Sequence, residues 1–246
     1  MNIIGIIPSR YNSTRFPGKP LIDIKGKSMI QRVYEQAIKS TELSEVYVAT
    51  DDTRIEQHVK GFGGNVIMTS TSHQSGTDRC LEAISLIHRT PDVIVNIQGD
   101  EPFINPDQID LIASLFNSPS TQIATLATPI GTTLDLFNPN ITKVILNKES
   151  EAIYFSKHAI PFIRNINREE WINHYTFLKH IGIYAYTPKA LAEITSLEQS
   201  PLELLEGLEQ LRWVENKYRI KTTITPHDSI SVDTPEDLKN FLQVYS

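Results

Sequence analysis

Residues 2–20 read NIIGIIPSRYNSTRFPGKP, and this stretch decides the fold. It opens with a short, nearly continuous apolar run at residues 2–7, which is typical of a strand buried on both faces of a parallel sheet. Similar runs occur at residues 46–49, 66–68 and 93–97, with amphipathic stretches at helical spacing between them, at residues 29–37 and 81–88. This alternation of strand and helix predicts an α/β fold with crossover helices.

The second half of the chain has a different pattern. Longer strands are predicted at residues 123–130, 143–147 and 180–186, and helices are sparse until residues 201–215. The final helix is predicted to follow Thr234, which can cap it, with Pro235 in the first turn and Asp237 three residues past the cap. We therefore expect an α/β part followed by a mixed segment, with no flexible linker between them.

Length and composition narrow the class of protein. A chain of 246 residues fits one large domain or two small ones. Its net charge of −6 argues against broad nucleic-acid binding and against binding to an anionic membrane surface. Cys80 is the single cysteine, so nothing indicates an oxidising compartment. The start of the chain lacks the features of a signal peptide, and no run reaches the roughly 20 apolar residues of a membrane helix, so we expect a cytoplasmic protein.

The loop after the first predicted strand carries three cations, Arg10, Arg15 and Lys19, and no acidic residue. In α/β proteins ligands bind at the carboxyl ends of the strands, where these side chains could neutralise a polyphosphate. The loop is neither a Walker A motif nor a dinucleotide fingerprint, because Lys19 precedes Pro20 and no G-x-G-x-x-G occurs. The alternative is a solvated basic turn.

Two acidic residues also follow predicted strands. Asp100 lies in Gln98-Gly99-Asp100-Glu101-Pro102, directly after one apolar run, and Asp233 follows a short apolar stretch before the final helix. Carboxylates beside a triphosphate commonly hold Mg²⁺, so both are candidate metal ligands. Asp100 could instead be a turn residue, and Asp233 could simply favour the start of a helix. The metal hypothesis requires that both carboxylates meet at one ion.

The segment His73-Gln74-Ser75-Gly76-Thr77 precedes the helix predicted at residues 81–88. Ser75 and Thr77 could cap this helix, or the backbone here could contact the edge of a base. His73 is expected to be a polar loop residue and not a metal ligand. No H-E-x-x-H, C-x-x-C or G-x-S-x-G motif occurs, so zinc hydrolysis and an elbow-type serine nucleophile have no support.

Taken together, these segments closely resemble the 3-deoxy-manno-octulosonate cytidylyltransferase family, also called CMP-KDO synthetases. The resemblance is carried by residues 7–21, 73–77, 96–102 and 232–238, and further by Phe137-Asn138-Pro139-Asn140, Tyr154-Phe155-Ser156, His180-Ile181-Gly182-Ile183-Tyr184 and Leu208-Glu209-Gln210-Leu211-Arg212. It covers essentially the full chain. Several such blocks in the same order are far more specific than any one of them.

The resemblance implies an α/β, Rossmann-like nucleotidyltransferase sheet, mostly parallel, with a smaller mixed α+β dimerisation part. It implies a single domain with a nucleotide-binding part at residues 1–130, a mixed sugar-binding and dimerisation part at 131–200, and a return to the main sheet at 201–246. The implied reaction converts CTP and 3-deoxy-D-manno-octulosonate (KDO) into CMP-KDO and pyrophosphate, with Mg²⁺, in a homodimer that serves lipopolysaccharide biosynthesis.

The same resemblance implies a role for each candidate residue. Arg10, Arg15 and Lys19 would hold the CTP phosphates and, with Asp100, form the catalytic set. The residues expected near the nucleoside are Gln74, Ser75, Gly76 and Thr77, the expected metal ligands are Asp100 and Asp233, and the expected sugar pocket consists of Gln98, Arg164, His180, Tyr184, Glu209 and Gln210.

The sugar pocket is where this sequence departs from the family. Lys157 stands where arginine is expected, which leaves the sugar specificity open. Arg164 is the leading candidate to face the sugar carboxylate, with Lys157 in reserve. His180 and Tyr184 lie four apart in a predicted strand and so share a face, although both could serve only packing. The alternatives left open are a cytidylyltransferase for 8-amino-KDO or sialic acid, and a non-catalytic sensor of CTP or sugar nucleotides.

Overall fold

A nine-stranded sheet organises the computed structural model, which describes residues 1–12, 16–229 and 231–244. Along its main path the strands follow the order β11 (Ile220–Ile224), β7 (Ile123–Pro129), β10 (Leu178–Tyr186), β6 (Val93–Asn96), β1 (Ile3–Ser9), β4 (Glu45–Thr50) and β5 (Val66–Met68). The strands β8 (Lys143–Leu146) and β9 (Ala152–Ser156) extend it beside β10. A separate small hairpin is formed by β2 (Asp23–Ile24) and β3 (Lys27–Ser28).

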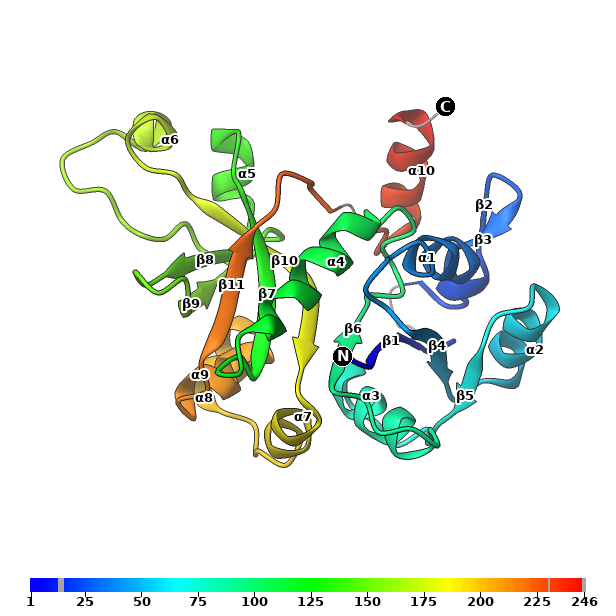
Figure 1. Ribbon diagram of the computed structural model, residues 1–246. Helices are drawn as coiled ribbons and strands as arrows, with labels where there is room; N and C mark the ends of the chain where they lie inside the picture. Colours follow the sequence, from blue (N-terminus) through cyan, green and yellow to red (C-terminus); the bar gives the residue numbers. More distant parts are fainter. Residues whose placement is uncertain (13–15, 230, 245–246) are drawn as a thin grey trace.

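Most strands of the main path run in one direction. β1 pairs in parallel with β4 and β6, and β7 pairs in parallel with β11. β10 is inserted antiparallel between β6 and β7, so it separates two parallel groups. The predicted α/β fold with a mostly parallel sheet is confirmed (Figure 1).

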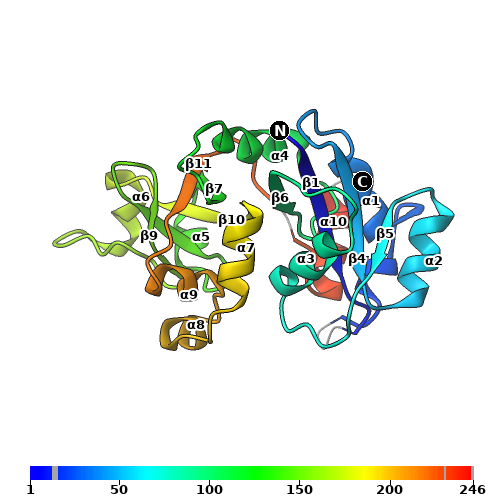
Figure 2. The same cartoon turned by 60° about the horizontal axis from the view of Figure 1, so that its bottom comes forward.

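Helices cover both faces of the sheet (Figure 2). One face packs against α1 (Met29–Ala37), α2 (Thr53–Gly61) and α4 (Pro106–Ser114), and the other against α3 (Gly76–Ser85), α7 (Pro188–Thr195) and α9 (Gln210–Glu215). Successive residues of β1 alternate between these two cores: Ile3 and Ile7 enter the first, Ile4 and Ile6 the second. Burial on both faces explains why the sequence of β1 is almost continuously apolar.

The mixed part is built on the β8–β9 hairpin, with α5 (Thr133–Phe137) and α6 (Trp171–His174) around a small core of their own. That core contains the buried side chains of Leu136, Trp171 and Phe177. Short 3₁₀ turns occur at Lys19–Leu21, Leu115–Asn117 and Arg168–Glu170.

Helix boundaries differ from the sequence prediction at two places. The helix expected at residues 81–88 is α3, which begins at Gly76, so Thr77 lies inside the helix and does not cap it. Ser75 is the N-cap, as predicted. The helix expected at residues 201–215 is two helices, α8 (Pro201–Glu206) and α9, because Gly207 takes a left-handed conformation (φ 63°) that ends the first.

The final helix, α10 (Pro235–Val244), begins where it was predicted. Thr234 Oγ1 accepts a hydrogen bond from the backbone N–H of Asp237 (3.1 Å), and the Asp237 carboxylate accepts one from the backbone N–H of Thr234 (2.8 Å). These reciprocal bonds form a capping box. Among the described residues, no helix is both long and apolar enough to cross a membrane.

Candidate functional site

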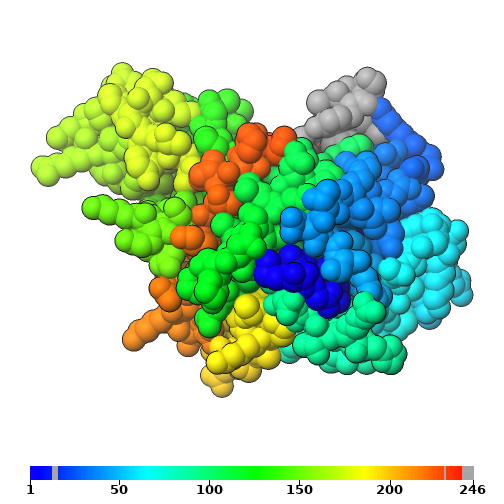
Figure 3. All heavy atoms as spheres, viewed as in Figure 1, coloured from blue at the N-terminus to red at the C-terminus, as the bar shows by residue number. Residues whose placement is uncertain are grey.

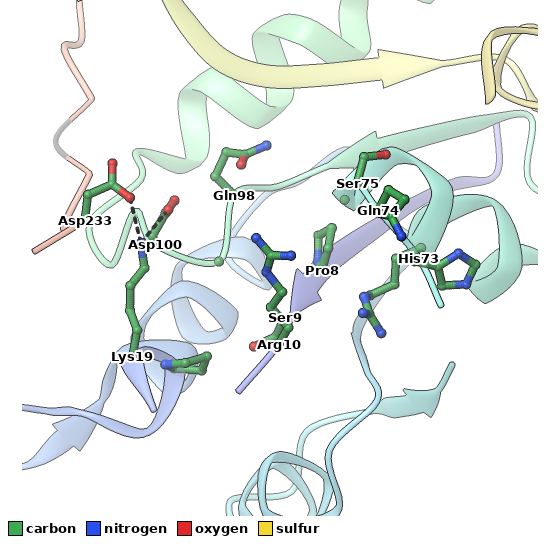
Figure 4. A pocket seen from close by; sticks show the side chains of 14 residues that line it. Pro8, Ser9, Arg10, Lys19, His73, Gln74, Ser75, Gln98, Asp100 and Asp233 are labelled. Atoms are coloured by element: carbon green, nitrogen blue, oxygen red, sulfur yellow. Dashed lines mark hydrogen bonds and ion pairs between the residues drawn. The ribbon is translucent and has the colours of Figure 1, made fainter. Parts of the chain in front are cut away.

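A cavity of about 320 Å³ lies at the carboxyl ends of β1 and β6 (Figure 4). The two strands are parallel neighbours, so the loops that follow them leave the sheet at the same edge. The cavity is lined by Pro8, Ser9, Arg10, Lys19, Pro20, His73, Gln74, Ser75, Gly76, Arg79, Gln98, Gly99, Asp100 and Asp233. A Cβ at Gly99 would lie 2.9 Å from the carbonyl oxygen of Pro8, so the close approach of these two loops requires glycine at this position.

Lys19 lies between two carboxylates in this cavity. Its Nζ is 2.8 Å from Asp100 Oδ2 and 3.0 Å from Asp233 Oδ1 (dashed lines in Figure 4). The two acids that were predicted to share one ion therefore converge on a single cation. Two carboxylates that both lie within 3.0 Å of one ammonium could serve as ligands of Mg²⁺ if substrate phosphates supplied further oxygens.

The backbone brings Asp233 to Asp100. The N–H of Val232 donates a hydrogen bond of 2.9 Å to the carbonyl of Asp100. The side chain of Val232 is fully buried with Ile24 and Met29, which follow the N-terminal loop. One small apolar cluster thus anchors the segment before α10 beside the N-terminal loop and the end of β6.

The start of α3 forms one wall of the cavity. Ser75 Oγ accepts a hydrogen bond from the backbone N–H of Asp78 (3.1 Å), and the Asp78 carboxylate accepts one from the backbone N–H of Ser75 (3.1 Å). Gln74, Ser75 and Gly76 line the cavity, whereas Thr77 is buried beneath it. Thr77 Oγ1 donates a hydrogen bond of 2.9 Å to Glu209 Oε2. The hydroxyl of Thr77 therefore binds a distant carboxylate and does not cap α3.

Of the three cations predicted to hold phosphates, Arg10 and Lys19 line the first cavity. Arg10 is exposed at the end of β1 and lines the cavity, and Arg15 lies outside the described residues. Arg79, which the sequence analysis did not single out, also lines the cavity; its guanidinium is buried and donates to Thr69 Oγ1 at 2.6 Å. His73 Nε2 is hydrogen-bonded to the Glu82 carboxylate, consistent with a polar loop residue. The hydrogen bond to His73 lowers the pKa of Glu82.

A second cavity of about 550 Å³ adjoins the first and shares Gln98, Asp100 and Asp233 with it. Its remaining lining residues are Glu101, Asn140, Ile141, Thr142, Lys179, His180, Gly182, Tyr184, Leu208, Gln210, Asp228, Ser229 and Ser231. Four of the six residues predicted for the sugar pocket line it: Gln98, His180, Tyr184 and Gln210. The two acids thus stand at the boundary between two adjoining spaces.

His180 and Tyr184 share one face of β10, as predicted, with ring centroids 5.3 Å apart. Between Ile181 and Tyr184 a bulge gives β10 two more residues than the facing part of β7. Because side chains alternate with a period of two, this even number leaves His180 and Tyr184 on the same face. His180 Nε2 is 3.0 Å from Thr125 Oγ1. Although the ring reaches the cavity, burial lowers the pKa of His180 to about 3, so the ring is neutral near pH 7.

Glu209, Arg164 and Lys157 do not line this cavity. Glu209 immediately precedes α9, is bonded to Thr77 and has a pKa raised by burial. Arg164 is exposed in the mixed part and is not among the residues that line this cavity. Lys157 lines a different hollow, together with Leu204 and Leu205.

Several lining residues were missed from the sequence. Lys179 precedes His180 in β10, and its sequence context did not distinguish it from a surface lysine. Glu101 follows Asp100; burial, together with the charge of Asp100, raises the pKa of Glu101 to about 7. Asp228 and Ser229 belong to the segment after β11, and no local pattern indicates that this segment returns to β10.

Comparisons with known proteins agree with this architecture. A family model described as cytidylyltransferase matches residues 4–221. The chain is 59% identical to the 3-deoxy-manno-octulosonate cytidylyltransferase of Parabacteroides distasonis, over 98% of this chain and 97% of the relative. It is 55% identical to the protein of the same name from Bacteroides thetaiotaomicron, over 98% and 96%. A solved structure of CMP:2-keto-3-deoxy-manno-octonic acid synthetase complexed with CTP superposes with a TM-score of 0.91 at 39% identity, covering 100% of this chain and 98% of that one.

Proposed function

The chain belongs to the 3-deoxy-manno-octulosonate cytidylyltransferase family, and we propose that it transfers CMP from CTP to KDO, releasing pyrophosphate. In this reaction the anomeric hydroxyl oxygen of the sugar forms a bond to the α-phosphorus of CTP. The bond between that phosphorus and the oxygen bridging to the β-phosphate breaks, and the hydroxyl proton is released. The names of the relatives and the likeness to a CTP complex support this activity.

One observation carries the proposal: Asp100 and Asp233 line both cavities and converge on one cation. A reaction that joins two substrates needs its charged groups where the substrates meet, and these carboxylates lie at that boundary. Phosphoryl transfer depends chiefly on positioning and on offsetting charge. A site arranged in this way fits nucleotidyl transfer better than simple nucleotide binding.

The first cavity is suited to CTP. Arg10 and Lys19 would offset the charge of the triphosphate and of the departing pyrophosphate. Gln74, Ser75 and Gly76 would border the cytidine, with the backbone at the start of α3 available to the base. Arg15 belongs to the same proposed set, although it lies outside the described residues.

We assign Asp100 and Asp233 as the ligands of one Mg²⁺, which when bound would lower the pKa of the sugar hydroxyl and offset charge at the α-phosphate. Lys19 already holds these two carboxylates together, so its ammonium must yield at least one of them to another cation. It would then be released toward the CTP phosphates, which in this proposal occupy the first cavity that Lys19 lines.

The second cavity is suited to the sugar acid. Gln98, His180, Tyr184 and Gln210 supply neutral polar groups, which can hydrogen-bond to sugar hydroxyls without adding charge. Because its pKa is lowered to about 3, His180 would contact the sugar as a neutral imidazole. Arg164 and Glu209 would take part only if the parts of the chain that carry them move toward the cavity or if a second copy supplies them.

We further propose that the chain forms a homodimer through its mixed part, within the cytoplasm, where CTP is available. Among the described residues, six of the eleven exposed large apolar side chains belong to this part or to α8: Leu134, Ile153, Phe162, Tyr175, Leu204 and Leu205. The yellow-green segment of the mixed part stands out from the body of the molecule at the upper left of Figure 3. Phe162 is 71% exposed. Exposed apolar surface gathered in this way favours an interface between proteins.

A pyrophosphate-release assay with CTP and Mg²⁺ tests the proposal against its alternatives. We expect KDO to be turned over much faster than 8-amino-KDO or sialic acid, and EDTA to abolish release. Asp100→Asn should lower turnover by about 10²-fold or more, as expected for the loss of one preorganised charged group. Preference for another sugar would correct the substrate, and CTP binding without turnover of any sugar would favour the sensor.

A further inference from the structure

Among the described residues that line the second cavity there is one lysine, Lys179, and no arginine. Four carboxyl groups share the lining: Asp100, Glu101, Asp228 and Asp233. The carboxylate of an anionic sugar in this cavity needs a fixed cation opposite it, because burying an unpaired charge is costly. The predicted partners of that carboxylate, Arg164 and Lys157, are not in the cavity, so the cation must be sought among the groups that are.

Lys179 already binds a carboxylate. Its Nζ is 2.7 Å from Asp228 Oδ1 and donates a second hydrogen bond of 3.2 Å to the carbonyl of Ser229. The side chain of Lys179 is 22% exposed and that of Asp228 is 62% exposed. The ammonium is therefore held in place by strand β10, whereas its partner is mostly in water.

The energetics favour exchange of this partner. An ion pair with an exposed member contributes little to stability, so little is lost when Asp228 leaves. A ligand carboxylate inside the cavity would meet the same ammonium with less solvent around it, which strengthens the attraction. The hydrogen bond to the carbonyl of Ser229 uses a second N–H of the Lys179 ammonium. This bond can remain when Asp228 leaves, because an ammonium has three N–H donors.

Two other basic side chains near this cavity, Lys19 and His180, are unsuited to binding the sugar carboxylate. Lys19 is bonded to Asp100 and Asp233 and lines the first cavity, not the second. His180 is neutral because burial lowers its pKa to about 3. Among the described residues lining the second cavity, Lys179 is thus the group that can supply a full positive charge.

We propose that Lys179 binds the carboxylate of the sugar acid and that Asp228 is the internal carboxylate which occupies Lys179 in the absence of substrate. This inference rests on the proposed function, because it names the group that selects an acidic sugar at that site. It makes Lys179 a specificity-determining residue, and Asp228 competes with the sugar carboxylate for it. The two substitutions that break the pair should therefore have opposite effects on sugar binding.

The experiment compares wild type with Lys179→Met, Lys179→Arg and Asp228→Asn, using KDO and its C1 carboxamide with CTP in the pyrophosphate-release assay. Lys179→Met should raise KM for KDO by about tenfold or more, as expected for loss of a charge-assisted hydrogen bond, and leave KM for CTP within about twofold. It should also abolish the preference for the acid over the carboxamide. Lys179→Arg should retain most of that preference, and Asp228→Asn should lower KM for KDO.

The two substitutions separate recognition from a structural role. If Lys179 only anchored the segment at Asp228, both Lys179→Met and Asp228→Asn would raise KM for KDO, and the acid-to-carboxamide preference would survive; this result overturns the inference. Should Lys179→Met fail to fold, the direction of the effect of Asp228→Asn decides alone. Wild-type turnover with no dependence on Lys179 rejects the inference and leaves the proposed function standing, whereas no turnover of any sugar by wild type rejects both.

Discussion

Thr77 in the first turn of α3 donates a hydrogen bond of 2.9 Å to Glu209, which lies 132 positions later in the chain. Thr77 follows Gly76, which lines the first cavity, and Glu209 precedes Gln210, which lines the second. Glu209 stands at the N-terminus of α9, yet its carboxylate makes no capping bond to its own helix. The bond therefore connects the walls of the two cavities across the molecule.

Removing this bond should weaken the fold. Thr77→Val keeps the shape of the side chain but leaves the half-buried carboxylate of Glu209 without this donor. We expect the free energy of unfolding, measured by urea denaturation, to fall by about 1–3 kcal/mol. Thr77→Ser retains the hydroxyl and should recover most of the loss. Equal losses in the two variants would mean that packing of the threonine methyl group, not the hydrogen bond, is what matters.

Lys19 should compete with a divalent cation for Asp100 and Asp233. Its ammonium bonds to both carboxylates, so Lys19→Met removes the competing charge. We expect Mn²⁺ to bind this variant about tenfold more tightly in the absence of CTP, measured by electron paramagnetic resonance, because a unit charge at this range is worth several kcal/mol before solvent screening. Turnover should nevertheless fall, since the phosphates lose a cation.

The matched control is Lys179→Met, which removes a lysine that does not contact these two acids. It should leave Mn²⁺ affinity close to that of wild type. If Lys19→Met binds Mn²⁺ no better than wild type, or more weakly, Asp100 and Asp233 are not the ligands of the ion.

Much of the fold could be predicted because its strands are buried on both faces. β1 and β6 are nearly continuous apolar runs for that reason, and such a run can be recognised in the sequence without knowing which strands lie beside it. β9 and β11 were missed because they carry polar or exposed positions, such as Ile153 in β9 and Lys221 in β11. The direction of β10 could not be read either, since apolar pattern does not distinguish parallel from antiparallel pairing.

The candidate site was predictable where its residues follow strands. Asp100 and the N-terminal loop follow β6 and β1, and adjacent parallel strands bring such loops together. Lys179 and Asp228 were not predictable, because they meet only through the return of a distant segment to β10. Thr77 was misread as a cap because a hydroxyl near a helix start is usually explained locally.

His180 should make the protein less stable in acid. Burial holds its pKa at about 3 in the folded state, whereas an unfolded histidine titrates near 6.5. Between these values acid protonates the unfolded chain alone, so stability is complete above about pH 6.5 and is lost as pH falls toward 3. His180→Gln can keep a hydrogen bond to Thr125 but has no such titration. Between pH 7 and pH 5, wild type should lose about 2 kcal/mol more than this variant.

Urea denaturation at several pH values measures this difference. His88→Gln is the matched control, because the side chain of His88 is exposed, and its pH dependence should follow that of wild type. Parallel curves for wild type and His180→Gln would show that the folded protein protonates His180 readily, and the neutral role assigned to this ring in sugar binding would then be wrong.

The exposed leucines of α8 should hold two chains together. Leu205 is 83% exposed and Leu204 lies beside it, next to a hollow that also contains Phe137. Leu205→Glu places a charge in the proposed apolar interface, where its desolvation is costly, and we expect light scattering to show the mass of two chains for wild type and of one chain for the variant. Leu86→Glu, at an exposed leucine after α3, should remain dimeric. A monomeric wild type, or a dimer unaffected by Leu205→Glu, would exclude this face as the interface.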